Sequence, residues 1–71
     1  MTETRQERFK RLAIYRTNAV LEKLRILGNL SNRSNYDYTD DDIRKVFRAV
    51  EEQLRAIKLK FTLKNKREFR L

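Results

Sequence analysis

The chain has 71 residues with no cysteine and no histidine, and its 18 lysines and arginines outnumber its 10 aspartates and glutamates, for a net charge of +8. The two missing residue types exclude disulfides, thiolate nucleophiles, imidazole bases and the common zinc sites. We therefore expect a protein that is not an enzyme and that has no cofactor and no metal site. The positive charge favours a polyanionic partner, and nucleic acid is the first such partner to consider.

The hydropathy of the chain argues against a membrane partner. No apolar stretch approaches the roughly 20 residues that cross a bilayer. The amino-terminal segment MTETRQERFKR lacks the apolar region of a signal peptide. We expect a cytoplasmic protein.

A first helix is predicted over residues 3–27. The chain has no proline and only one glycine, Gly28, so it has little of the punctuation that strands and tight turns require. Arg16 interrupts the main apolar face, while Ile14 and Leu21 form a second, narrower strip. The residues at helical spacing on the main face are Phe9, Leu12, Ala13, Val20, Leu24 and Leu27. Gly28 follows this pattern directly, and we expect it to end the helix in the left-handed conformation.

A polar loop and a second helix follow. Residues 28–38 are rich in asparagine and serine, which favour turns. Thr39 and Asp42 have the spacing of a capping box, and Asp40 and Asp41 suit the positive end of a helix, so we interpret these aspartates as capping residues and not as a cation site. The second helix is predicted over residues 40–61, followed by a basic tail over residues 62–71. Its apolar stripe comprises Ile43, Val46, Phe47, Val50, Leu54, Ile57 and Phe61.

These elements predict an all-α fold, a two-helix antiparallel hairpin with a basic C-terminal tail in a single domain over residues 1–71. A chain this short has a thin core. Ile14, Leu21, Leu59 and Leu63 lie off the main stripes and would stay exposed in a lone hairpin. We therefore expect a homodimer in which two hairpins form a four-helix arrangement.

Two clusters of basic residues are candidate phosphate ligands, one in the first helix and one in the tail. The candidates are Arg5, Arg8, Lys10, Arg11, Lys64, Lys66, Arg67 and Arg70. A third basic group, formed by Arg44, Lys45, Arg48 and Arg55, shares its helix with Glu51 and Glu52. We interpret part of its charge as ordinary solvated surface with pairing between residues four apart.

The loop offers a second kind of surface. Its candidate partner-binding residues are Asn32, Arg33, Asn35 and Tyr36, because asparagine and arginine side chains read base edges and tyrosine stacks on bases. The competing interpretation is that asparagine and serine simply close turns. The partner is thus a nucleic acid, DNA before RNA, or an acidic or nucleic-acid-binding protein.

The stretch LGNLSNRSNY, followed by the acidic helix start, resembles a group of short, mostly uncharacterised helical proteins encoded on bacterial plasmids, integrative elements and prophages. The resemblance covers roughly residues 8–61. It implies a mobile genetic element and transfers no site residues. Small basic helical proteins of such elements bind DNA as accessory or regulatory factors, or they inhibit a host effector as anti-CRISPR proteins do.

Overall fold

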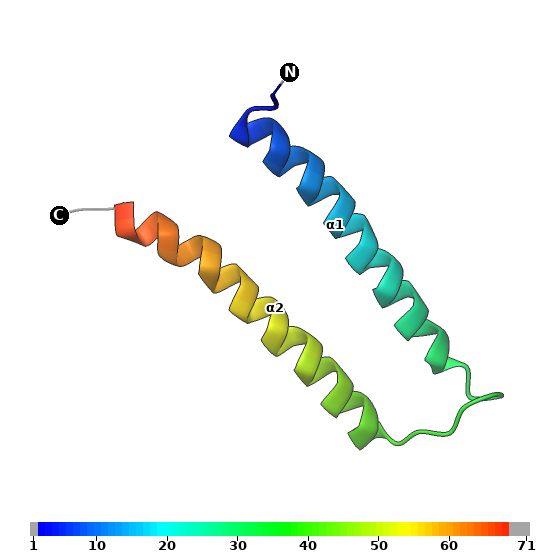
Figure 1. Ribbon diagram of the computed structural model, residues 1–71. Coiled ribbons are helices and arrows are strands. Elements are labelled where there is room, and N and C mark those ends of the chain that lie inside the picture. Colours follow the sequence, from blue (N-terminus) through cyan, green and yellow to red (C-terminus); the bar gives the residue numbers. More distant parts are fainter. Residues whose placement is uncertain (1, 69–71) are drawn as a thin grey trace. The chain divides into compact units, whose positions relative to one another are not determined.

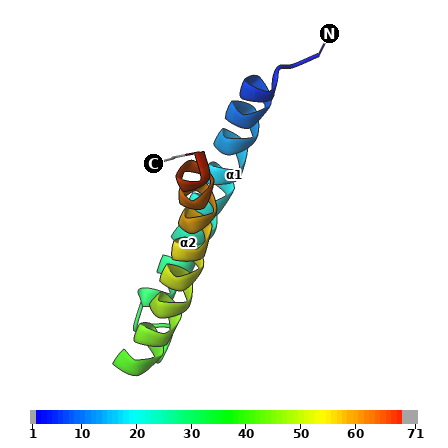
Figure 2. The same ribbon diagram turned by 90° about the vertical axis from the view of Figure 1, so that its left-hand side faces the viewer.

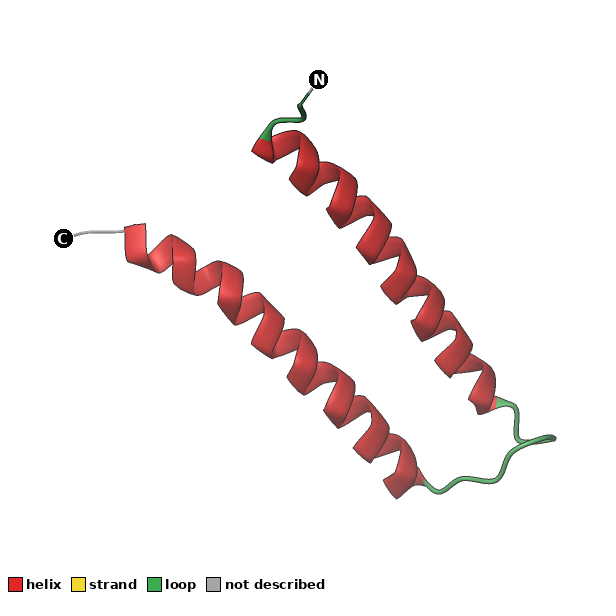
Figure 3. Ribbon diagram, viewed as in Figure 1, coloured by secondary structure: helices red, strands yellow, loops and turns green. Residues whose placement is uncertain are grey.

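The computed structural model describes the backbone of residues 2–68 and the side chains of residues 2–62. It contains two α-helices, α1 (Arg5–Gly28) and α2 (Asp40–Glu68) (Figures 1 and 3). A short 3₁₀ helix, η1 (Asn29–Ser31), follows the first. No strand occurs in residues 2–68. The all-α prediction is therefore confirmed. The chain divides into two units, Met1–Asp37 with α1 and η1, and Tyr38–Leu71 with α2. The antiparallel hairpin and the pairing of two copies stay predictions.

The start of α1 is set by a capping box that the sequence analysis missed. The backbone N–H of Glu7 donates to Oγ1 of Thr4 at 3.0 Å, and the backbone N–H of Thr4 donates to Oε1 of Glu7 at 2.9 Å. Each bond satisfies a donor that the first turn would otherwise leave unpaired. The helix accordingly begins at Arg5, two residues after the predicted start.

The end of α1 differs from the prediction in conformation. Gly28 is right-handed, with φ −63° and ψ −23°, and Asn29 follows it at φ −64°. The expectation of a left-handed Gly28 was wrong. The physical reason is that the chain continues into η1, and the backbone N–H of Asn29 donates to the carbonyls of Ile26 and Leu27. A tightened last turn already supplies partners for the terminal carbonyls, so no reversal of the backbone is needed.

The loop after η1 is built around Asn32. Its carbonyl accepts the backbone N–H groups of Asn35 at 3.1 Å and Tyr36 at 3.0 Å. Its side-chain Oδ1 accepts the backbone N–H of Ser34 at 3.0 Å. This arrangement is an Asx-type turn, in which a short polar side chain replaces a backbone acceptor.

The predicted capping box of α2 is confirmed. The backbone N–H of Asp42 donates to Oγ1 of Thr39, and the backbone N–H of Thr39 donates to Oδ2 of Asp42, both at 3.0 Å. Asp41 forms two ion pairs in the same turn. Its Oδ2 lies 3.3 Å from Nζ of Lys45, and its Oδ1 lies 3.5 Å from Nη2 of Arg44. The aspartates thus act in helix capping and local ion pairs, as the sequence indicated.

The C-terminal part of α2 extends further than predicted. The helix runs to Glu68, so most of the segment expected to form a tail over residues 62–71 is helical. Strong helix formers such as Leu63, Lys64 and Lys66 account for this continuation, because nothing after Phe61 breaks the helix. Figure 2, in which α2 lies in front, shows α2 as one continuous helix.

The apolar faces of both helices are open. No side chain in residues 2–62 is buried, and the most exposed apolar residues include Ile14 at 64% and Phe9 and Phe61 at 59%. Over the described residues, neither helix is long and apolar enough to cross a membrane. Because burial of apolar surface is the main favourable term in folding, these faces are the principal unsatisfied feature of the chain.

Candidate nucleic-acid interface

Four of the predicted phosphate ligands lie near the start of α1, and all four are exposed: Arg5, Arg8, Lys10 and Arg11. The capping box and a nearby ion pair determine which of them are free to bind. Glu7, the acid nearest to them in the helix, is held by Thr4.

Arg11 differs from the other three because Glu3 holds it in a two-point contact. Its Nε lies 2.9 Å from Oε2 of Glu3, and its Nη2 lies 2.8 Å from Oε1. The hydrogen bond with Arg11 lowers the pKa of Glu3, and the same bond raises the pKa of Arg11. A phosphate would have to compete with this carboxylate, so Arg11 is the weakest of the four candidates.

Arg5, Arg8 and Lys10 have no acidic partner within 4.0 Å among the described side chains. Arg5 and Arg8 are three residues apart and therefore share one side of α1. These three cations form the free basic group of α1. They can approach a phosphate without first breaking an ion pair.

The predicted ligands near the C-terminus are only partly described. Lys64, Lys66 and Arg67 lie on the helical backbone of α2, but their side chains lie outside the described residues. Arg70 lies outside the described residues altogether. The placement of these four residues at an interface stays a prediction.

The predicted partner-binding loop is brought together by one turn. Asn32, Arg33, Asn35 and Tyr36 are all exposed, and they occupy the turn that Asn32 closes. The Oδ1 atom of Asn32 is used within this turn, which agrees with the turn-closing interpretation for that residue. Tyr36, with 46% of its surface exposed, is the aromatic side chain of the turn that is open to a partner.

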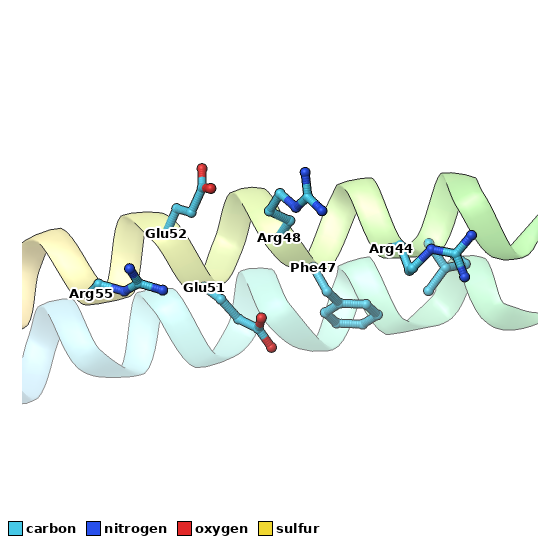
Figure 4. Close-up of a pocket in the computed structure, with 7 residues that line it drawn as sticks. Arg44, Phe47, Arg48, Glu51, Glu52 and Arg55 are labelled. Atoms are coloured by element: carbon cyan, nitrogen blue, oxygen red, sulfur yellow. The ribbon is translucent and has the colours of Figure 1, made fainter.

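The structure also shows a basic surface that the sequence analysis set aside. A shallow groove on α2 is lined by Ile43, Arg44, Phe47, Arg48, Glu51, Glu52 and Arg55 (Figure 4). The expected pairing of its arginines with the glutamates does not occur. Arg48 and Arg55 have no carboxylate within 4.0 Å among the described residues, although Glu51 and Glu52 lie three and four residues away. The signal that identifies this surface is the spacing 44, 48 and 55, which places three arginines on one flank of a helix.

In the described residues, no group of three acidic side chains is arranged to hold a metal ion. No family model, no curated protein and no solved structure matches the chain. Function must therefore be inferred from the residues themselves.

Proposed function

We propose that the chain is a small, basic, non-enzymatic nucleic-acid-binding protein that acts in the cytoplasm as an accessory or regulatory factor of a bacterial mobile element. The observation that carries the proposal is the set of exposed cations without acidic partners on both helices: Arg5, Arg8 and Lys10 on α1, and Arg48 and Arg55 on α2. Each such cation can displace counterions from a phosphate.

The mode of binding in this proposal is recognition of the phosphate backbone and not of base sequence. The segment between the two helices, residues 29–39, is too long and too polar for the tight turn of a helix-turn-helix motif. Duplex DNA is the proposed polymer. The basic C-terminal residues Lys64, Lys66, Arg67 and Arg70 are part of the proposed interface.

Assembly is part of the same proposal. Both helices expose apolar stripes, with Val20 at 55% and Leu54 at 50% exposure. A two-helix hairpin that pairs with a second copy would cover more of these stripes than a single hairpin can. Small chains without disulfides or metals commonly gain stability in this way.

The test is a fluorescence-anisotropy titration of a labelled DNA duplex at salt concentrations between about 50 and 200 mM. Log affinity falls with log salt by about 0.9 per phosphate contacted. Replacing Arg5, Arg8 and Lys10 together by glutamine should lower this slope by about three and weaken binding at low salt.

A matched control removes the same charge from cations that already have carboxylate partners. Replacing Arg11, Arg25 and Lys45 by glutamine removes residues that pair with Glu3, Glu22 and Asp41. This variant should lose less of the salt slope. Equal losses in both variants would show that only net charge matters, and absence of binding by the unmodified chain at 50 mM would reject the proposal.

A second candidate function is supported by the loop. The turn at Asn32 displays Tyr36, and Leu30 just before it is 48% exposed, so an aromatic and an aliphatic side chain lie near one another in the sequence and open to a partner. This suits a protein-interaction module or an inhibitor of a host effector, as anti-CRISPR proteins are. A stoichiometric complex with a nuclease or other effector, lost on replacing Tyr36 by alanine, would favour this alternative.

A further inference from the structure

The apolar stripe of α2 contains a regular heptad seam. The seam residues alternate at spacings of four and three: Ile43, Phe47, Val50, Leu54, Ile57 and Phe61. Such spacing keeps every member on one line along a helix that packs against another helix. The seam is open, since Phe47 and Leu54 are each 50% exposed and Phe61 is 59% exposed.

The seam is symmetric about residue 52, and this symmetry matters for what can cover it. When α2 is placed against a reversed copy of itself, Ile43 lies opposite Phe61, Phe47 opposite Ile57, and Val50 opposite Leu54. Each of these pairs places two apolar side chains at the same height along the helices. The two-fold axis then generates the same three pairs a second time. An isologous contact of this kind is self-complementary by construction.

The first helix does not offer an equivalent seam. Arg16 lies between Ala13 and Val20 on its main apolar face, so α1 would place an arginine against the middle of the α2 seam. Burying a cation without a partner is costly. A second copy of α2 supplies an apolar side chain at every level instead.

The charge along α2 favours the antiparallel orientation. Asp40, Asp41 and Asp42 form its first turn, whereas Lys58 and Lys60 lie in its C-terminal half. In a reversed pair, the acidic end of each helix lies beside the basic end of the other, and the helix dipoles also oppose. A parallel pair would instead bring like charges together at both ends.

We propose that α2 pairs antiparallel with α2 of a second copy, and that this pairing joins the basic flanks of the two helices into one face. Because the two-fold axis is perpendicular to the plane of the helix pair, the same flank of both helices faces the same side. That flank carries four cations, Arg44, Arg48, Arg55 and Lys58, together with the two acids Asp41 and Glu51, so its net charge is positive. The binding of nucleic acid to this face rests on the proposed function, whereas the pairing of the two helices does not.

The length of this face suits a nucleic-acid duplex. Arg44 and Lys58 are fourteen residues apart, which is about 21 Å along a helix. That distance corresponds to about six base-pair steps of duplex DNA. In the dimer, Arg44 of each copy lies opposite Lys58 of the other, and Asp41, which pairs with Arg44, offsets part of this charge. The combined face keeps an excess of cations, which repel one another. A phosphate backbone on this face relieves the repulsion, and nucleic acid therefore strengthens the pairing.

Cysteine crosslinking tests the orientation, because the natural chain has no cysteine. Gln53 lies next to Gln53 of the second copy in the proposed dimer, so Gln53→Cys should form a disulfide-linked dimer on mild oxidation. Val46 lies opposite Lys60, and its two copies are about 21 Å apart, so Val46→Cys should not. A dimer by sedimentation without the Gln53→Cys crosslink would indicate a parallel pair, in which the two copies of residue 53 lie on opposite flanks. Equal crosslinking at both positions would contradict the antiparallel register, and a monomer with no crosslink at either position would reject the seam.

Neutralising two unpaired arginines tests the basic face separately. Arg48→Gln together with Arg55→Gln removes two cations without carboxylate partners from this face and leaves the seam residues unchanged. The dimer should persist in sedimentation equilibrium, while the salt slope of duplex DNA binding falls by about two for each chain. An unchanged salt slope would overturn this face arrangement. Dimerisation without DNA binding would leave the seam intact and reject only the proposed function.

Discussion

Replacing Gly28 by alanine distinguishes the observed end of α1 from the one expected of a glycine at that position. Gly28 is the last residue of α1 and has φ −63°, within the right-handed helical region that alanine prefers. A Cβ atom added there meets no atom within 4 Å. The substitution therefore introduces no clash and no backbone strain.

The expected change follows from the unfolded chain and from helix propensity. Glycine is about 0.5–1 kcal/mol less favourable than alanine in a helix, because it loses more backbone freedom on folding. Gly28→Ala should raise the free energy of unfolding by about this amount, which corresponds to a rise of several degrees in Tm for a domain of this size. Far-UV circular dichroism at 222 nm, followed during heating and urea titration, measures both quantities. Asn18→Ala, at an exposed position within α1, is the matched control, and it should also stabilise the chain.

If Gly28 were left-handed, Gly28→Ala would be expected to lower the free energy of unfolding. Alanine in that conformation costs roughly 1–2 kcal/mol, so Gly28→Ala would destabilise the chain while Asn18→Ala still stabilised it. That combination of results would refute the right-handed end of α1 and its continuation into η1.

Three further predictions concern capping, pH and the basic surface. Thr39→Ala removes the N-cap of α2 and should cost about 1 kcal/mol in urea unfolding, whereas Thr39→Ser should retain most of the stability. The hydrogen bond from the backbone N–H of Thr39 lowers the pKa of Asp42, so the stabilisation from this carboxylate is present above its unfolded pKa near 4 and is lost as the pH falls through the lower folded pKa. Ellipticity measured from about pH 6 to pH 2 should therefore fall more steeply for the natural chain than for Asp42→Asn, and parallel curves would contradict this. Because Arg11 is held by Glu3, Arg8→Gln should reduce the salt slope of DNA binding by about one and Arg11→Gln by less; the reverse order would show that phosphate displaces Glu3.

The sequence predicted the helix starts and ends with uneven success, for physical reasons. The capping box of α2 was recognised because Thr39 and Asp42 stand in a run of aspartates before an apolar stripe. The same box at Thr4 and Glu7 was missed because strong helix formers surround it and no run of aspartates marks the start of the helix. Gly28 was assigned the wrong conformation because a glycine permits a left-handed end but does not require one.

The candidate site was predictable in kind but not in detail. Composition and spacing identify basic surfaces on both helices, yet they do not show which cations are already paired. Only the geometry reveals that Arg11 is held by Glu3, while Arg48 stays unpaired beside Glu51 and Glu52. Exposed ion pairs are worth little, so small differences in side-chain conformation decide which of them form.

The exposed apolar faces link the stability of this chain to its proposed partners. Helices of 24 and 29 residues gain only modest stability from caps and from pairs of residues three or four apart, and none of the described side chains is buried. In the proposed dimer, burial of the α2 seam against a second copy would supply the missing apolar contacts. A polyanion that binds only the paired form stabilises it further by mass action, by about 2.7 kcal/mol at a hundred times its Kd. Helix content should therefore rise with protein concentration and again on addition of duplex DNA, and these two increases can be measured separately.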